Sequence, residues 1–141
     1  MFDRNMDRVS LSAMSTTFGA PRPDPADYML QAAASAAGCG YKQELMELMD
    51  VQPGQTALDV GCGPGTDLPT LAGRVGVSGT VIGVDRDPAM LAEARRRTSD
   101  LPAVQIREAD AHALPVEPGT VDRARIDRVL MHVTEPTSVL A

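Results

Sequence analysis

Short apolar runs rich in β-branched residues recur along the second half of the chain, and each is followed by polar or glycine-containing sequence. Such runs are typical of strands buried in a parallel sheet, and the segments between the first three have helical spacing. The pattern predicts strands over Thr56–Val60, Thr80–Asp85, Val104–Glu108 and about Val121–Ile126, and helices over about Asp67–Val75 and Pro88–Thr98. This alternation implies a parallel α/β sheet with right-handed crossovers, for which we expect the strand order 3-2-1-4.

The N-terminal part has a different pattern. Pro21-Arg22-Pro23-Asp24-Pro25 is incompatible with a regular helix, whereas Ala26–Ala37 is rich in alanine and predicts a helix that ends at Gly38. A second helix is expected over Tyr41–Asp50. We therefore interpret residues 1–40 as an N-terminal cap or mobile segment, and residues 41–141 as the core.

A glycine-rich turn follows the first predicted strand, in the sequence Leu58-Asp59-Val60-Gly61-Cys62-Gly63-Pro64-Gly65. Glycines leave space above the backbone, and the N–H groups at the start of the next helix favour an anionic or carboxylate-bearing ligand. The spacing is Gly-x-Gly-x-Gly. A dinucleotide fingerprint is Gly-x-Gly-x-x-Gly, so the spacing disfavours a nicotinamide oxidoreductase.

Two further acids follow predicted strands. Asp85 ends the run Thr80–Asp85, and Asp110 comes just after Val104–Glu108. A carboxylate at the tip of the second parallel strand can accept hydrogen bonds from ribose hydroxyls. Each acid alone could be a helix N-cap or a solvated turn residue, but together with the turn they indicate one ligand site at the carboxyl ends of the strands.

The turn and these acids resemble the motifs of the class I S-adenosylmethionine (SAM)-dependent methyltransferases, over about residues 41–141. The resemblance is strongest to the small-molecule branch that includes ubiquinone and menaquinone biosynthesis. It implies a Rossmann-like fold, SAM as the cofactor and methyl transfer to a small-molecule acceptor. The cofactor-binding residues that it implies are Asp59, Gly61, Cys62, Gly63, Gly65, Asp85, Arg86, Met90, Asp110, Ala111 and Arg128.

This resemblance implies a separate set of binding residues for each part of SAM. Asp85 holds the ribose, Asp110 and Ala111 hold the adenine, and Met90 lies beside the ring. Asp59 and the three glycines hold the methionine part. Arg128 is a candidate contact for its carboxylate, and a guanidinium at the surface is an equal alternative for this residue.

His132, which follows the fourth predicted strand, is a candidate general base toward an acceptor hydroxyl. A histidine in a loop is more often a hydrogen-bonded packing residue, and His112 lies farther from the reacting carbon. Tyr28 and Tyr41 precede the core, where related enzymes place residues over the SAM carboxylate, but we interpret both as packing residues.

Composition limits the classes of partner. A chain of 141 residues with a net charge of −6 has room for one domain and lacks the basic surface that nucleic acid requires. No stretch is apolar over enough residues to cross a membrane, and no secretory leader is recognisable. Its two cysteines form no Cys-x-x-Cys pair and no metal site is expected. We expect a cytoplasmic protein.

The sequence ends at Ala141, where the family would continue through a helix and further strands of a seven-stranded sheet. We therefore expect a sheet that lacks the C-terminal strands and leaves an open edge on the fourth strand. The stretch Val121-Asp122-Arg123-Ala124-Arg125-Ile126 is unusually charged for a central parallel strand, and these charges would partly protect that edge. Truncation, a split gene product, and completion by a homo-oligomer or a partner chain all remain open. The alternative function is a non-catalytic SAM-binding or interaction module that needs a partner chain.

Overall fold

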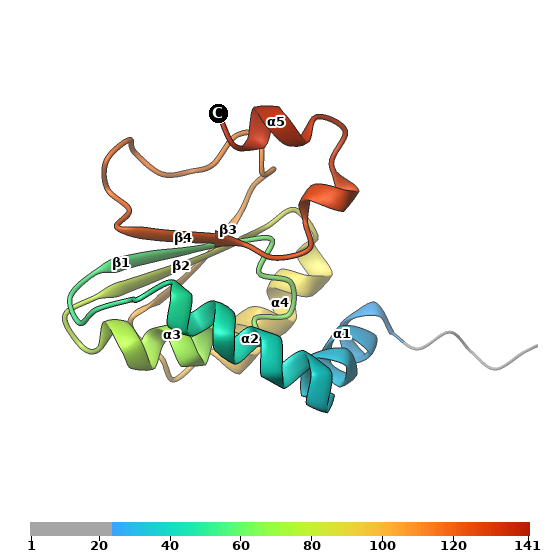
Figure 1. The fold of residues 1–141 in the computed structure, drawn as a ribbon, viewed down its shortest axis with the longest axis horizontal. Helices are drawn as coiled ribbons and strands as arrows, with labels where there is room; N and C mark the ends of the chain where they lie inside the picture. The colour runs from blue at the N-terminus through green and yellow to red at the C-terminus, as the bar shows by residue number, and fades with distance from the viewer. Residues whose placement is uncertain (1–23) are drawn as a thin grey trace, which may run out of the picture.

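The computed structural model describes residues 24–141 and has one sheet with helices packed against it (Figure 1). The elements are α1 (Pro25–Ala34), α2 (Ala36–Leu48), β1 (Thr56–Val60), α3 (Leu68–Val75), β2 (Thr80–Asp85), α4 (Pro88–Arg97), β3 (Val104–Glu108), β4 (Arg123–Ile126), the 3₁₀-helix η1 (Leu130–His132) and α5 (Pro136–Val139). The four strands are parallel and lie in the order β3-β2-β1-β4, so the predicted topology is confirmed.

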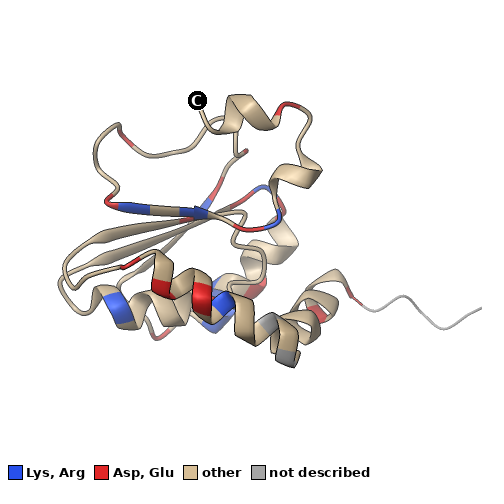
Figure 2. Ribbon diagram, in the orientation of Figure 1, with Lys and Arg blue, Asp and Glu red and all other residues tan. Residues whose placement is uncertain are grey.

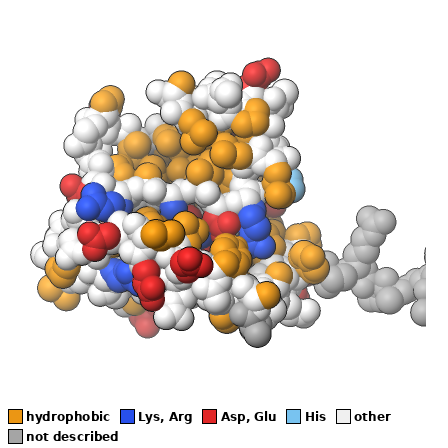
Figure 3. Space-filling view, in the orientation of Figure 1, with side chains coloured by type: hydrophobic (Ala, Val, Ile, Leu, Met, Phe, Trp, Pro, Cys, Tyr) orange, Lys and Arg blue, Asp and Glu red, His pale blue; other side chains and the backbone are white. Residues whose placement is uncertain are grey.

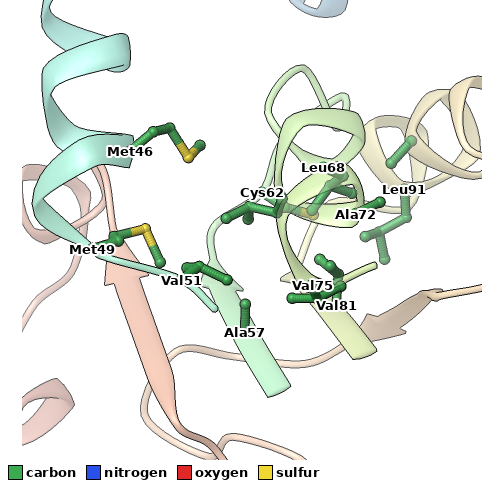
Figure 4. Close-up of a cluster of buried hydrophobic side chains, with 12 residues drawn as sticks. Met46, Met49, Val51, Ala57, Cys62, Leu68, Ala72, Val75, Val81 and Leu91 are labelled. Carbon is green, nitrogen blue, oxygen red and sulfur yellow. The ribbon is translucent and has the colours of Figure 1, made fainter. Parts of the chain in front are cut away.

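Each face of the sheet has its own apolar cluster. On the face that carries α2, α3 and α4, strand residues such as Ala57 and Val81 pack with Leu71 and Leu91 of the helices (Figures 1 and 4). On the other face, side chains of β1 and β2 are buried beneath the segment 109–126. None of the helices in residues 24–141 is long and apolar enough to span a membrane.

The two N-terminal helices divide at a different residue from the predicted one. The break is at Ser35, whose backbone is extended (φ −65°, ψ 152°) and whose N–H and Oγ both donate to the carbonyl of Ala32. Gly38 and Gly40 lie inside α2, because glycine permits a helix end without requiring one. The expected boundary between cap and core at residue 40 therefore falls inside α2, and residues 1–23 lie outside the described part.

β4 is shorter than predicted, and one of its two arginines is buried instead of solvated. Asp122 precedes it and exchanges two hydrogen bonds with Thr56, which anchors the start of β4 on β1. Arg123 and Arg125 alternate along the strand (Figure 2). The side chain of Arg125 is only 5% exposed and is ion-paired, so its expected role as a charge that protects an open edge is wrong.

Candidate functional site

A cavity of about 600 Å³ opens at the carboxyl ends of β1, β2 and β4, beside α1 and η1. This is the position at which ligands bind in open parallel sheets, next to the point where the strand order reverses. Nine of the residues expected from the sequence line it: Gly61, Gly63, Asp85, Arg86, Met90, Asp110, Ala111, Arg128 and His132. Asp59, Cys62 and Gly65 do not.

The glycine turn needs its glycines for different reasons. Gly61, Gly63 and Gly65 all have positive φ (72°, 54° and 76°), a region that other residues rarely adopt. A Cβ on Gly61 would lie 2.0 Å from Cγ2 of Val129, so the turn passes directly beneath the segment after β4. A Cβ on Gly65 would lie 3.1 Å from Cα of Ala94 in α4. Gly65 therefore serves the packing of the turn against α4.

Asp85, at the end of β2, holds the turn from the neighbouring strand. Its Oδ2 accepts from the N–H of Gly63 at 2.9 Å, and its Oδ1 accepts from the N–H of Asp87 at 3.0 Å. A carboxylate has about four lone-pair sites, so these two bonds leave acceptor capacity facing the cavity. One side chain thus fixes both the turn and the start of α4 at the cavity wall.

Asp110 follows β3 and is held by His112. Its Oδ1 accepts from the N–H of His112 at 2.9 Å and lies 2.5 Å from the ring Nδ1. The hydrogen bond from that N–H lowers the pKa of Asp110 most, and the bond from the ring lowers it further. Asp110 therefore presents an anionic acceptor at the cavity. His112 does not line the cavity.

The carboxylate of Asp59 lies on the helix-covered face of the sheet and is 1% exposed as a residue. Its Oδ1 accepts from Nε of Arg125 at 2.9 Å, and Nη2 of Arg125 also contacts Asp67 at 2.6 Å. Lys42 of α2 binds the same Asp67. Burial raises the pKa of Asp59 to about 6, against the opposing effect of Arg125. Asp59 is therefore a buried ion-pair residue and does not face the cavity.

Cys62 likewise points away from the cavity. Its side chain is buried in the apolar cluster beneath the sheet with Leu68 (Figure 4). Burial raises the pKa of its thiol, and the negative charges of Asp59 and Asp85 add to this effect. Cys62 is a core residue of the turn.

The ion pairs continue to a carboxylate that the sequence analysis missed. Asp127, directly after β4, lines the cavity, lies 3.7 Å from Nη2 of Arg125 and accepts from the hydroxyl of Tyr41 at 2.8 Å. Partial burial raises the pKa of Tyr41, and the hydrogen bond to Asp127 raises it further. No local sequence signal marks this network, because Asp59 and Arg125 become direct neighbours only through the register of β1 and β4.

The interpretation as a packing residue is wrong for Tyr28, whereas Tyr41 connects α2 to the segment after β4. Tyr28 is 62% exposed and lines the cavity. Tyr41 bonds to Asp127, and its ring lies 5.8 Å from the guanidinium carbon of Arg128. Arg128 itself has a positive φ of 58°. The cavity rim on this side therefore combines α1 with the segment after β4, and Tyr41 of α2 contacts that segment from outside the cavity.

His132, the last residue of η1, lines the cavity next to Met131 and Val133. Its N–H donates to the carbonyl of Val129 at 2.8 Å, which fixes the short helical turn, and its imidazole makes no hydrogen bond with any residue in 24–141. Within that same range, no group of three or more His, Cys, Asp or Glu is placed to hold a metal ion.

Comparison with known proteins assigns the region that holds the glycine turn and the acids to a protein family. Residues 57–141 match a family model described as a methyltransferase domain. An uncharacterized 37.1 kDa protein in transposon Tn4556 of Streptomyces fradiae is 50% identical over 119 residues, which are 84% of this chain and 34% of that protein. Demethylmenaquinone methyltransferase of Bacillus cereus is 37% identical over 102 residues, which are 71% of this chain and 43% of the enzyme.

Among solved structures, a SAM-dependent methyltransferase from Aquifex aeolicus superposes with a TM-score of 0.65 and 27% identity. The match covers 70% of this chain and 53% of that one. The chain thus spans less than half the length of the two curated relatives above.

Proposed function

Since this chain belongs to the class I SAM-dependent methyltransferase family, we propose that its cavity binds SAM and that the protein transfers the methyl group to a small-molecule acceptor. The observation that supports this most is the convergence of Gly61, Gly63, Asp85 and Asp110 on one cavity of about 600 Å³. That volume is in the range of cofactor sites. The matched demethylmenaquinone methyltransferase supports a small acceptor.

The adenosine end is assigned to the side of the cavity formed by β2, α4 and the residues after β3. Asp85 has acceptor capacity for the ribose hydroxyls beyond its bonds to Gly63 and Asp87. Asp110, held anionic by His112, can accept from the adenine amino group, and the N–H of Ala111 can donate to the ring. Met90 provides an apolar surface for the ring at the start of α4.

The methionine end is assigned to the glycine turn and to the segment after β4. Gly61 and Gly63 present bare backbone to the cavity, and Arg128 offers a guanidinium for the carboxylate. A Cβ on Gly63 would lie 3.2 Å from Cε of Met29, so α1 covers the turn from above. This cover would exclude water from the ligand.

Bound SAM would supply an electrophilic methyl group on a sulfonium. What the chain must add is positioning of the acceptor and, for a hydroxyl acceptor, removal of a proton. His132 is placed for the second task, because its imidazole lies at the cavity and makes no hydrogen bond with residues 24–141. The apolar side chains of Met131 and Val133 beside it suit the body of a small acceptor.

A second candidate is a non-catalytic SAM-binding module that acts with a partner chain. The specific observation in its favour is that β4 pairs only with β1 among the described residues. Both candidates require the cofactor site.

Calorimetric titration of the 141-residue chain with SAM, with NAD as the matched control, tests the part that they share. We expect micromolar binding of SAM and no response to NAD. Binding of NAD in place of SAM, or no binding by a folded sample, would contradict the proposal. Methyl transfer to small quinol or phenol acceptors by a chain that binds SAM would then separate the enzyme from the module.

A further inference from the structure

Asp127 is a carboxylate at the cavity, and only one of its two oxygens accepts a hydrogen bond from residues 24–141. Its side chain is 12% exposed, and its Oδ2 accepts from the Tyr41 hydroxyl. Its Oδ1 accepts no hydrogen bond from residues 24–141; Nε of Arg128 lies 3.6 Å from it, beyond hydrogen-bond distance. A carboxylate oxygen in such a place is an acceptor for a donor that comes from the ligand.

The charges behind Asp127 make a cationic donor the favoured one. The buried network holds three carboxylates, of Asp59, Asp67 and Asp127, and two cations, of Lys42 and Arg125. Among the side chains of this network that are at most 13% exposed, the carboxylates therefore exceed the cations by one, which favours the approach of a further cation. Arg128 supplies a third cation, with its Nε 3.6 Å from Oδ1 of Asp127, but its side chain is 47% exposed, so water screens this pair more than the buried ones.

We propose that Asp127 accepts a hydrogen bond from the α-ammonium group of the methionine part of SAM and so fixes that end of the cofactor. This proposal rests on the proposed function and deepens it. It moves the acid of the methionine end from Asp59, which is buried and bonded to Arg125, to a residue that the sequence motif does not mark. Asp127 and Arg128, adjacent and of opposite charge, then match the ammonium and carboxylate of an amino acid.

The other members of the network act through Asp127 as positioning residues. The hydroxyl of Tyr41 fixes Oδ2, and the guanidinium of Arg125 lies 3.7 Å from the same oxygen. Both restrict the rotation of the carboxylate, and neither engages Oδ1. Since Tyr41 lies in α2, the methionine end is also the place where the N-terminal helices contact the ligand site.

The test compares two ligands by calorimetry on the 141-residue chain: S-adenosylhomocysteine and its analogue in which hydrogen replaces the α-amino group. We expect the wild-type protein to bind the parent ligand about 10- to 100-fold more tightly than the analogue, as for a lost hydrogen bond to a charged group. In Asp127→Asn this ratio should fall close to one. Asp100→Asn, on the exposed turn after α4, should keep the wild-type ratio.

The outcomes are separable. Equal binding of both ligands by the wild type, or an unchanged ratio in Asp127→Asn, would overturn the role of Asp127 while leaving the cofactor site intact. No binding of either ligand by the folded wild type would contradict the proposed function itself. If Asp127→Asn does not fold, Tyr41→Phe takes its place, and a ratio that does not fall in this variant also counts against the proposal.

Discussion

At the scale of single residues, Asp85 joins two tasks that are usually separate. Its two oxygens hold the N–H groups of Gly63 and Asp87, so the carboxylate stabilises the glycine turn and the start of α4. The same side chain lines the cavity at the position assigned to the ribose. The ligand site and the local fold thus depend on one side chain.

Asp85→Ala should weaken SAM binding by about 1–3 kcal/mol, as expected for a lost charged hydrogen-bonding group, and calorimetry measures it. Thermal unfolding of the same variant separates a lost contact from a disordered turn. Asp100→Ala, at an exposed position, is the matched control. Unchanged affinity in Asp85→Ala would place the ribose elsewhere.

Asp59 makes stability depend on pH in a defined direction. Its pKa in the folded protein is about 6, above the ordinary 3.8, because burial disfavours the charged form. The folded state therefore holds the proton more tightly than the unfolded chain, and the stability that this contributes is complete below about pH 4 and lost as pH rises through 6.

Asp59→Asn removes this titration, so the wild type should lose up to about 3 kcal/mol relative to the variant between pH 4 and pH 7. Urea unfolding at several pH values measures the difference. Asp67 does not confuse the result, because its pKa is lowered and its contribution is lost only as pH falls below the ordinary value of 3.8. A difference that stays constant with pH would contradict the interpretation.

At the scale of elements, the turn after β1 fits closely beneath the segment after β4. A Cβ on Gly61 would meet the side chain of Val129, and the backbone at Gly61 has positive φ. Gly61→Ala should therefore destabilise the fold by roughly 2 kcal/mol or more through overpacking and backbone strain.

The double variant Gly61→Ala with Val129→Ala isolates the overpacking. It removes the nearest atom, Cγ2 of Val129, and leaves Cβ at 3.3 Å. Part of the lost stability should therefore return, and denaturant unfolding of the two single variants and the double measures it. If the effects of the two substitutions simply add, the two side chains do not compete for this space.

Sequence patterns predicted most elements because those elements depend on local signals. The strands Thr56–Val60 and Thr80–Asp85 were predicted to the residue, since each is an apolar run that ends at an acid or a glycine turn. The break at Ser35 was missed, because either Gly38 or Ser35 can end a helix and the choice depends on packing.

The site was predicted where its residues lie on one motif and missed where it depends on pairing between distant segments. Asp85 and Asp110 line the cavity as expected. The partners of Asp59 were not foreseen, because Arg125 becomes its neighbour only through the register of β1 and β4. The same pairing of β1 and β4 brings Asp127 to the cavity, and no local sequence motif marks this residue.

At the scale of the whole molecule, the sheet formed by the described residues has two edge strands, β3 and β4. β4 pairs with β1 alone among residues 24–141, and Ala124 of this strand is exposed. Hydrophobic side chains gather on the surface above β4 (Figure 3). An unpaired strand edge beside an apolar surface is a template for another chain.

The 141-residue chain should therefore self-associate as its concentration rises, which multi-angle light scattering measures. Ala124→Lys should reduce this, because lysine on an edge strand disfavours pairing. A matched lysine at the exposed Val77, in the turn between α3 and β2, should not. A clean monomer at high concentration would contradict the expectation.

The bond from the Gly63 amide to Asp85 also gives the molecule a built-in reporter. When a ribose hydroxyl approaches that carboxylate, the electron density that the amide proton senses must change, whatever the acceptor and whether or not methyl transfer occurs. The nuclear magnetic resonance frequency of one backbone proton would then follow occupancy of the cofactor site directly.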